Sequence, residues 1–191
     1  MGGWWSRAPF YIGRICCSHK YLMQTTNHRF PTVINQVSAY DESVSWDDVN
    51  EVRSETVFSQ TGLRLYNMPL RDALFRGTMA NQLWCTGFGF TNVGTVVGIE
   101  LRLITQRLAR IQDYTIQLIL NGELVGENRA NYMAENDQLY GGVNDMWGTV
   151  MTGADIMDAS FGVMVELGHN RNIPHADTGY IDAIELKVHF E

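Results

Sequence analysis

The stretch that decides the fold is LWCTGFGFTNVGTVVGIELRLI, residues 83–104. It contains two apolar runs separated by a turn at residues 92–94, and in the second run Val97, Ile99, Leu101 and Leu103 alternate with other residues. A period of two is typical of a half-buried strand, because successive side chains point to opposite faces of a sheet. We therefore expect two strands here. Gly87 and Gly89 fall inside the first strand-like run, where glycine allows a neighbouring ring or backbone to approach closely.

The same alternation recurs later in the chain. It runs through residues 114–120, 161–167 and 184–190, and the first of these is followed directly by Asn121-Gly122. Asn-Gly suits the two positive-φ positions of a type I′ turn, so residues 114–125 are expected to form a hairpin. The last strand should tie the C-terminal residues into a sheet.

Other segments carry weaker local signals. Residues 32–37, 44–52 and 55–65 are strand-like, with Trp46 as a packing anchor, and residues 67–77 suggest a short helix or turn. Thr152 followed three residues later by Asp155 resembles a helix cap and predicts one helical turn near residues 154–157. About eight strands joined by short turns, without βαβ alternation, favour an all-β fold: a jelly-roll-like sandwich of two antiparallel sheets.

The chain of 191 residues is expected to form one domain, residues 31–191, preceded by an extended N-terminal arm, residues 1–30. The arm has four basic residues and no acidic one, whereas the whole chain has a net charge of -7. Such an arm could dock on an acidic protein surface, or its charges could simply keep a tail soluble. The residues expected to contact a partner are Trp4, Trp5, Arg7, Arg14, Lys20 and Arg29.

Composition argues against several classes of function. An acidic body is unsuited to nucleic acid, which needs a basic patch. The three cysteines have no CxxC spacing that would predict a zinc site. Cys85 is expected to be a small buried residue. Cys16 and Cys17 are expected to be reduced thiols, with a disulfide bond between subunits as the alternative. There is no signal-peptide apolar region and no run long enough to span a membrane, so we expect a soluble protein that is not exported by a classical route.

The residues that could carry chemistry lie in the late loops. His169, His175 and Asp177 could bind a metal or supply a base, but their spacing matches no metal motif. Asp145, Asp155 and Asp158 flank Trp147, as carboxylates flank an aromatic platform in a glycosidase or glycan site, although packing of Trp147 and capping by Asp155 are the simpler explanations. No motif of a hydrolase, nucleotide-binding protein or metalloprotease is present, so we expect no enzymatic activity and no cofactor. The candidate ligand loop comprises Asn144, Asp145, Trp147, His169 and His175.

The order of several segments resembles a β-sandwich module of tailed-bacteriophage virion proteins. That module has a TGFGF strand, a GI-x-V strand, an LV-NG hairpin, a YG…D-WG…T-x-A-D-I…FGV block and a closing ID-x-I-x-V strand. The likeness extends from near Pro31 to the last residue; the turn at Val93-Gly94 departs from the module's pattern, and the arm has no counterpart in it. The matching positions are residues 86–90, 98–103, 118–122, 140–148, 152–156, 161–163 and 181–188.

This resemblance implies a non-enzymatic structural protein of the virion, made in the host cytoplasm. The arm favours a capsid decoration or cement protein that docks on the shell, with other virion proteins such as the major capsid protein or tail and neck proteins as partners. The alternative is a tail, collar or fibre component whose loops at residues 126–145 and 168–179 bind a host-surface glycan. We expect a homo-oligomer, a trimer being the state that a shell position would favour, with neither nucleic acid nor membrane as a partner.

Overall fold

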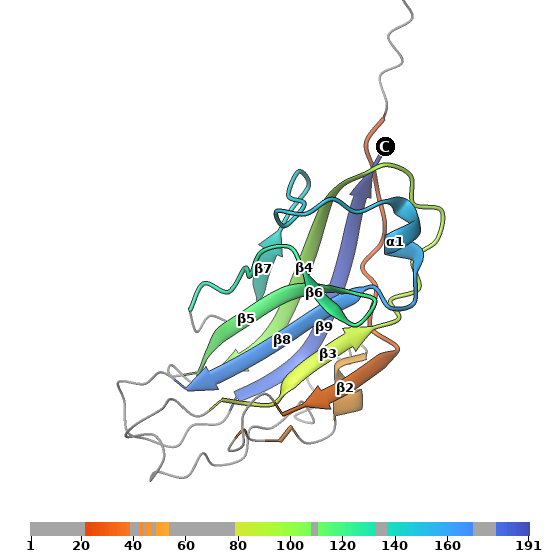
Figure 1. Ribbon diagram of the computed structural model, residues 1–191. Coiled ribbons are helices and arrows are strands. Elements are labelled where there is room, and N and C mark those ends of the chain that lie inside the picture. The colour runs from red at the N-terminus through yellow and green to blue at the C-terminus, as the bar shows by residue number, and fades with distance from the viewer. Residues whose placement is uncertain are drawn as a thin grey trace, which may run out of the picture.

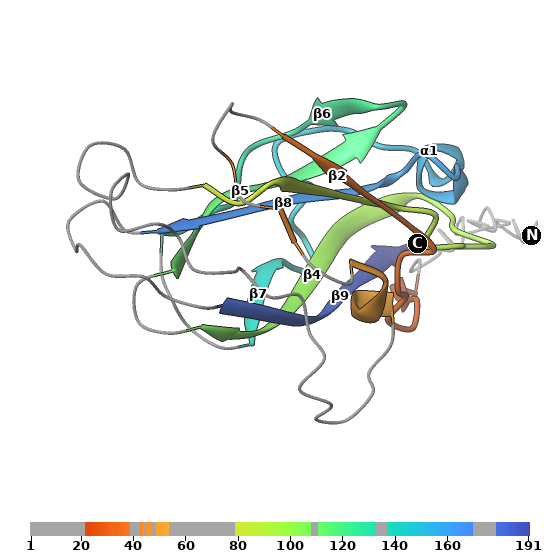
Figure 2. The same cartoon turned by 90° about the horizontal axis from the view of Figure 1, so that it is seen from below.

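The computed structural model describes residues 22–38, 43, 45–46, 49–53, 79–107, 111–132, 137–169 and 179–191 (Figure 1). Its strands form two antiparallel sheets packed face to face, and Figure 2 shows the two layers from the side. The expected all-β, two-sheet sandwich is confirmed. No helix in the described ranges has the length and apolar character needed to cross a membrane.

Nine described strands make up the two sheets. In the four-stranded sheet the order is β1 (Gln24–Thr25), β9 (Gly179–Phe190), β4 (Val96–Arg107) and β7 (Gln138–Gly141). In the five-stranded sheet the order is β2 (Val33–Val37), β3 (Gln82–Thr86), β8 (Gly162–His169), β5 (Ile111–Leu120) and β6 (Glu123–Val125).

The inner faces of the sheets carry the core that the alternation predicts. Ile99, Leu101 and Leu103 of β4 are fully buried, and so are the alternating apolar residues of β9. Val97 is an exception, because the β4–β9 register shifts between Val96 and Gly98 and Val96 takes the buried position instead. A bulge of this kind adds one residue to a strand and reverses the faces beyond it.

The two runs of residues 83–104 are strands, but they do not pair with each other. β3 belongs to the five-stranded sheet and β4 to the four-stranded one, so the intervening loop carries the chain from one layer to the other. The prediction that Gly87 and Gly89 sit inside a strand is wrong: both follow β3 and have positive φ, 72° and 65°. Gly89 has no close neighbour, and Gly87 is approached by a side-chain hydroxyl and not by the expected ring or backbone: a Cβ there would stand 2.3 Å from Oγ1 of Thr32.

Two local predictions are confirmed in detail. β5 and β6 pair as a hairpin whose turn residues Asn121 and Gly122 both have positive φ, 55° and 79°, as a type I′ turn requires. Thr152 is the N-cap of α1 (Gly153–Met157), and it forms a reciprocal capping box with Asp155.

Two predicted segments differ from the structure. The described residues of the range 44–52 do not form a strand. They belong in part to the 3₁₀-helix η1 (Val49–Arg53), and they include Trp46, which is buried as expected and donates its indole N–H to the Asn81 carbonyl at 2.6 Å. The loop predicted at residues 126–145 includes an edge strand, β7. The predicted strand at 55–65 and the helix or turn at 67–77 lie outside the described residues.

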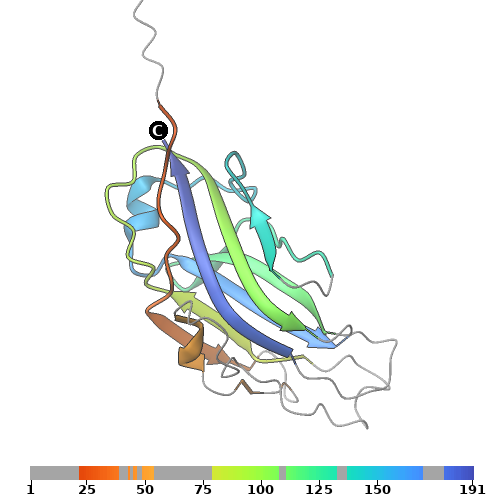
Figure 3. The same ribbon diagram turned by 180° about the vertical axis from the view of Figure 1, so that it is seen from behind.

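Both ends of the described chain are built into the four-stranded sheet. Before Pro31, residues 24–29 run along β9, through the short strand β1 and a bridge between Arg29 and Leu186 (Figure 3). The sandwich therefore begins earlier than residue 31. At the other end Glu191 and Thr95 exchange two backbone hydrogen bonds of 2.9 Å, so the expected anchoring of the C-terminal residues is confirmed.

Candidate functional site

Trp147 lies at a tight corner between the sheets and is 0% exposed. Its indole N–H donates to the Ile99 carbonyl at 2.9 Å, and its own backbone has a positive φ of 56°. Gly141 faces the ring so closely that a Cβ there would stand 2.4 Å from the indole nitrogen. The interpretation of Trp147 as a glycan-stacking platform is therefore wrong, because its ring has no accessible face for a sugar.

Asp145 fixes this corner from outside. One carboxylate oxygen accepts the backbone N–H of Trp147 at 2.8 Å and the Arg129 guanidinium at 2.5 Å. Arg129 also pairs with Glu127, whose backbone N–H donates to the Trp147 carbonyl at 2.6 Å. The carboxylate of Asp145 thus has a structural role as the link between two loops.

The other two carboxylates of the glycosidase hypothesis lie at the ends of α1, Asp155 in the N-terminal capping box and Asp158 at the C-cap position. Hydrogen bonds from Thr152, the backbone N–H first and the hydroxyl second, lower the pKa of Asp155. Bonds from Ser160 lower the pKa of Asp158 in the same way. A glycosidase pair needs one carboxyl group that keeps its proton near neutral pH, and both of these are shifted in the opposite direction.

The remaining members of the candidate ligand loop that the structure describes, Asn144 and His169, belong to different elements. Asn144 is exposed in the turn after β7, and His169 is the last residue of β8. His175 and Asp177 lie outside the described residues. The described ranges contain no group of three or more His, Cys, Asp or Glu residues that could hold a metal ion. Cys85 is buried, as expected.

A polar network that local sequence patterns did not predict lies on the outer face of the four-stranded sheet. Glu100 and Arg102 of β4 stand directly opposite Lys187 and Glu185 of β9. The ammonium of Lys187 lies 2.5 Å from Glu100, and Glu185, only 2% exposed, lies 3.6 Å from Arg102. Opposite charges in facing positions stabilise an antiparallel pair. Their alternation within each strand was visible in the sequence, but the register that pairs them was not.

The N-terminal segment joins this network from the edge. His28 places Nδ1 2.8 Å from a carboxylate oxygen of Glu185, and the Thr25 hydroxyl lies 3.0 Å from Nδ1 of His189. Burial, followed by a smaller contribution from Lys187, lowers the pKa of His189, and Glu100 opposes that shift. Backbone bonds from Thr26 and Arg29 to β9 complete the attachment.

Of the six arm residues expected to contact a partner, only Arg29 is among the residues that the structure describes. Arg29 is exposed beside β9, and its backbone exchanges two hydrogen bonds with Leu186, of 2.8 and 3.0 Å. Trp4, Trp5, Arg7, Arg14 and Lys20 lie outside the described residues.

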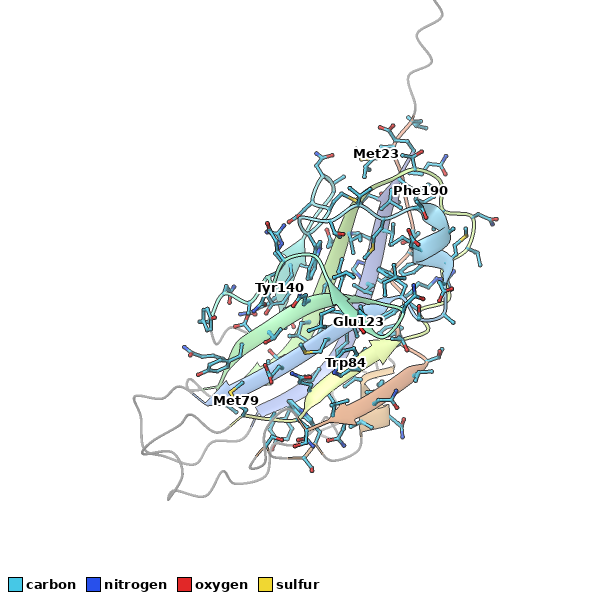
Figure 4. All side chains as sticks on the ribbon, in the orientation of Figure 1. Met23, Met79, Trp84, Glu123, Tyr140 and Phe190 are labelled. Carbon is cyan, nitrogen blue, oxygen red and sulfur yellow. The ribbon has the colours of Figure 1, made fainter. Side chains whose placement is uncertain are left out.

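A buried carboxylate at the other side of the sandwich also has a structural role. Asp113, 0% exposed, accepts the Tyr140 hydroxyl at 3.0 Å and the backbone N–H of Asn131 at 2.9 Å. These bonds hold the chain between β6 and β7 against the bulge in β5. Tyr140, which is labelled in Figure 4, is itself buried.

Searches for matching protein-family models, curated proteins and solved structures each find no match to this chain.

Proposed function

We propose that the protein is a non-enzymatic structural component of a tailed-bacteriophage virion, and that it serves as a decoration or cement protein attached to the shell through its N-terminal segment. The order of its sequence segments, from TGFGF to the closing strand, suggests this role. A rigid β-sandwich suits it, because the sandwich presents a fixed surface on a particle.

The observation that carries the proposal is the attachment of the N-terminal segment to the body. Residues 24–29 are hydrogen-bonded along β9, whose other neighbour is the long central strand β4. Any partner that binds the preceding basic residues is thereby coupled to the sheet itself. This arrangement suits an anchor, because load on the segment passes into the core through backbone bonds and the His28–Glu185 contact.

The structural roles of the candidate site residues also support a scaffold role for the protein. Asp145, Asp155 and Trp147 each hold a loop or a cap in place. The buried position of Trp147 also removes the main support for a glycan-binding tail or fibre component.

Deletion of residues 1–20 tests the attachment. Residues 22–29 and the sandwich remain in that variant, so it should still fold, as far-UV circular dichroism would show, but fail to join particles in a complementation assay. Wild-type chain added in trans is the control. Incorporation of the truncated chain at full occupancy would refute docking through the segment.

A further inference from the structure

One end of the sandwich gathers four segments that are far apart in the sequence. Gln24 pairs with Phe190, Thr95 with Glu191, and a Cβ on Gly153 would stand 2.2 Å from the Val93 carbonyl. We call this end the chain-entry pole and define it as residues 22–24, 91–95, 142–155 and 190–191. Figure 4 shows Met23 and Phe190 there, at the opposite end of the molecule from Met79.

The chain-entry pole exposes apolar side chains. Val150 is 90% exposed and Leu22 82%, and Met23 and Val143 are also exposed. Isolated apolar residues are normal on a surface, but several at one end of a small domain indicate a protein contact. Because Val150 is almost wholly accessible, none of the described residues covers it.

The charge of the chain-entry pole is of one sign. It contains Asp145, Asp155 and Glu191 and no lysine or arginine. Asp145 is paired with Arg129, which leaves the carboxylates of Asp155 and Glu191 to set the local potential. An apolar surface bordered by carboxylates is complementary to a segment that is both apolar and basic.

Residues 1–21 of this chain have that composition. They carry Arg7, Arg14 and Lys20, no acidic residue, and five aromatic residues. They join the body at Leu22, within the chain-entry pole itself. Fully extended, 21 residues reach roughly 70 Å, compared with about 40 Å for a strand the length of β9, so the segment is long enough to cross a neighbouring copy.

We infer that the chain-entry pole is a contact between copies of this protein, on which residues 1–21 of a second copy dock. Aromatic side chains of the incoming segment cover Val150 and Leu22, and its basic residues face Asp155 and Glu191. Reciprocal exchange closes a homo-oligomer in which every chain-entry pole is covered. This inference concerns the protein free of particles and does not rest on the virion role. On a shell, the same segment would bind the shell in place of the neighbouring copy.

Sedimentation velocity of the full-length chain over a range of concentrations tests the inference. The wild-type chain should associate reversibly and dissociate as salt is raised. Val150→Asp should weaken association by about tenfold or more, since it adds charge to the covered surface. Replacement of Arg7, Arg14 and Lys20 together by Glu should have a similar effect.

Two controls separate the contact from general surface effects. Leu139→Asp changes a residue that is 63% exposed on β7, outside the residues that define the pole, and should leave association unchanged. Arg7→Lys with Arg14→Lys keeps the charge of the segment and should also be neutral. Near-UV circular dichroism and urea unfolding establish that each variant is folded.

Three results would overturn the inference. The first is a chain that stays monomeric at every concentration tested. The second is an oligomer indifferent to Val150→Asp. The third is an oligomer that Val150→Asp weakens but the arm charge reversal does not, which would assign the pole to an occupant other than residues 1–21.

Discussion

Replacement of Trp147 tests whether this residue is part of the core. Trp147→Ala removes a fully buried indole from the corner between the sheets, and large-to-small changes of this kind cost about 3–5 kcal/mol. Trp147→Phe keeps most of the ring but loses the bond to Ile99. Since the Ile99 carbonyl also accepts from Gly142, it retains a partner, and the lost bond should cost only about 0.5–1.5 kcal/mol beyond the change in ring volume.

Urea unfolding followed by far-UV circular dichroism gives these differences without depending on tryptophan fluorescence. With a denaturant slope of about 1–3 kcal/mol/M, Trp147→Ala should lower the midpoint by roughly 1 M or more. Trp84→Phe is the matched control, because Trp84 is half-buried on β3 and donates to a neighbouring side chain, Gln82, on the same strand. It should lose less than about 1 kcal/mol.

A small loss of stability together with a loss of glycan binding would contradict the assignment of Trp147 to the core. If Trp147→Ala unfolds within about 1 kcal/mol of wild type and abolishes binding on a glycan array, the ring is a recognition surface and not part of the core.

Three further predictions concern backbone, charge and capping. Gly87→Ala should destabilise the fold by more than Gly89→Ala, because only at Gly87 would the new Cβ stand against Thr32. Both glycines have positive φ, so both substitutions share a backbone strain of about 1–2 kcal/mol. Equal urea midpoints for the two variants would contradict the packing argument. Burial lowers the pKa of His189 below its ordinary 6.5, so the unfolded chain binds the proton more readily. The free energy of unfolding is therefore highest above about pH 6.5 and falls as the pH drops below that value. His189→Gln should reduce the difference between the free energies of unfolding measured in urea at pH 8 and pH 5, and an unchanged difference would show that His189 is not its source. Thr152→Ala should cost about 1 kcal/mol in thermal unfolding by removing the cap of α1, whereas Thr152→Ser should restore it; a full loss in the serine variant would show that the hydroxyl is not the stabilising group.

The parts of the fold that were predicted correctly from the sequence depend on neighbouring residues. Asn121-Gly122 determines its turn through the φ preferences of two residues, and Thr152 with Asp155 forms a cap across three. The buried faces of β4 and β9 follow from alternation, which reports burial directly.

The parts that were missed depend on distant contacts. Alternation shows which face of a strand is buried but not which strand lies beside it, so the placement of β3 and β4 in different sheets could not be deduced. The bulge after Val96 arises from pairing with β9, and the short edge strand β7 from pairing with β4.

The candidate site was less predictable than the fold. Asp145 and Trp147 have the residue types of a glycan site, and only their partners, Arg129 and Ile99, identify them as parts of a structural corner. Gly141, which stands against the indole, was the available signal for a tightly packed ring. The pairing of opposite charges between β4 and β9 required the register, which no local pattern contains.

Electron microscopy of purified phage particles would locate the protein directly. With the chain labelled by a small tag after Glu191, a decoration protein should form a regular array of many copies over the shell, and the array should disappear when residues 1–20 are deleted. Absence of the protein from particles, or its confinement to a few copies on the tail, would contradict the proposed decoration role.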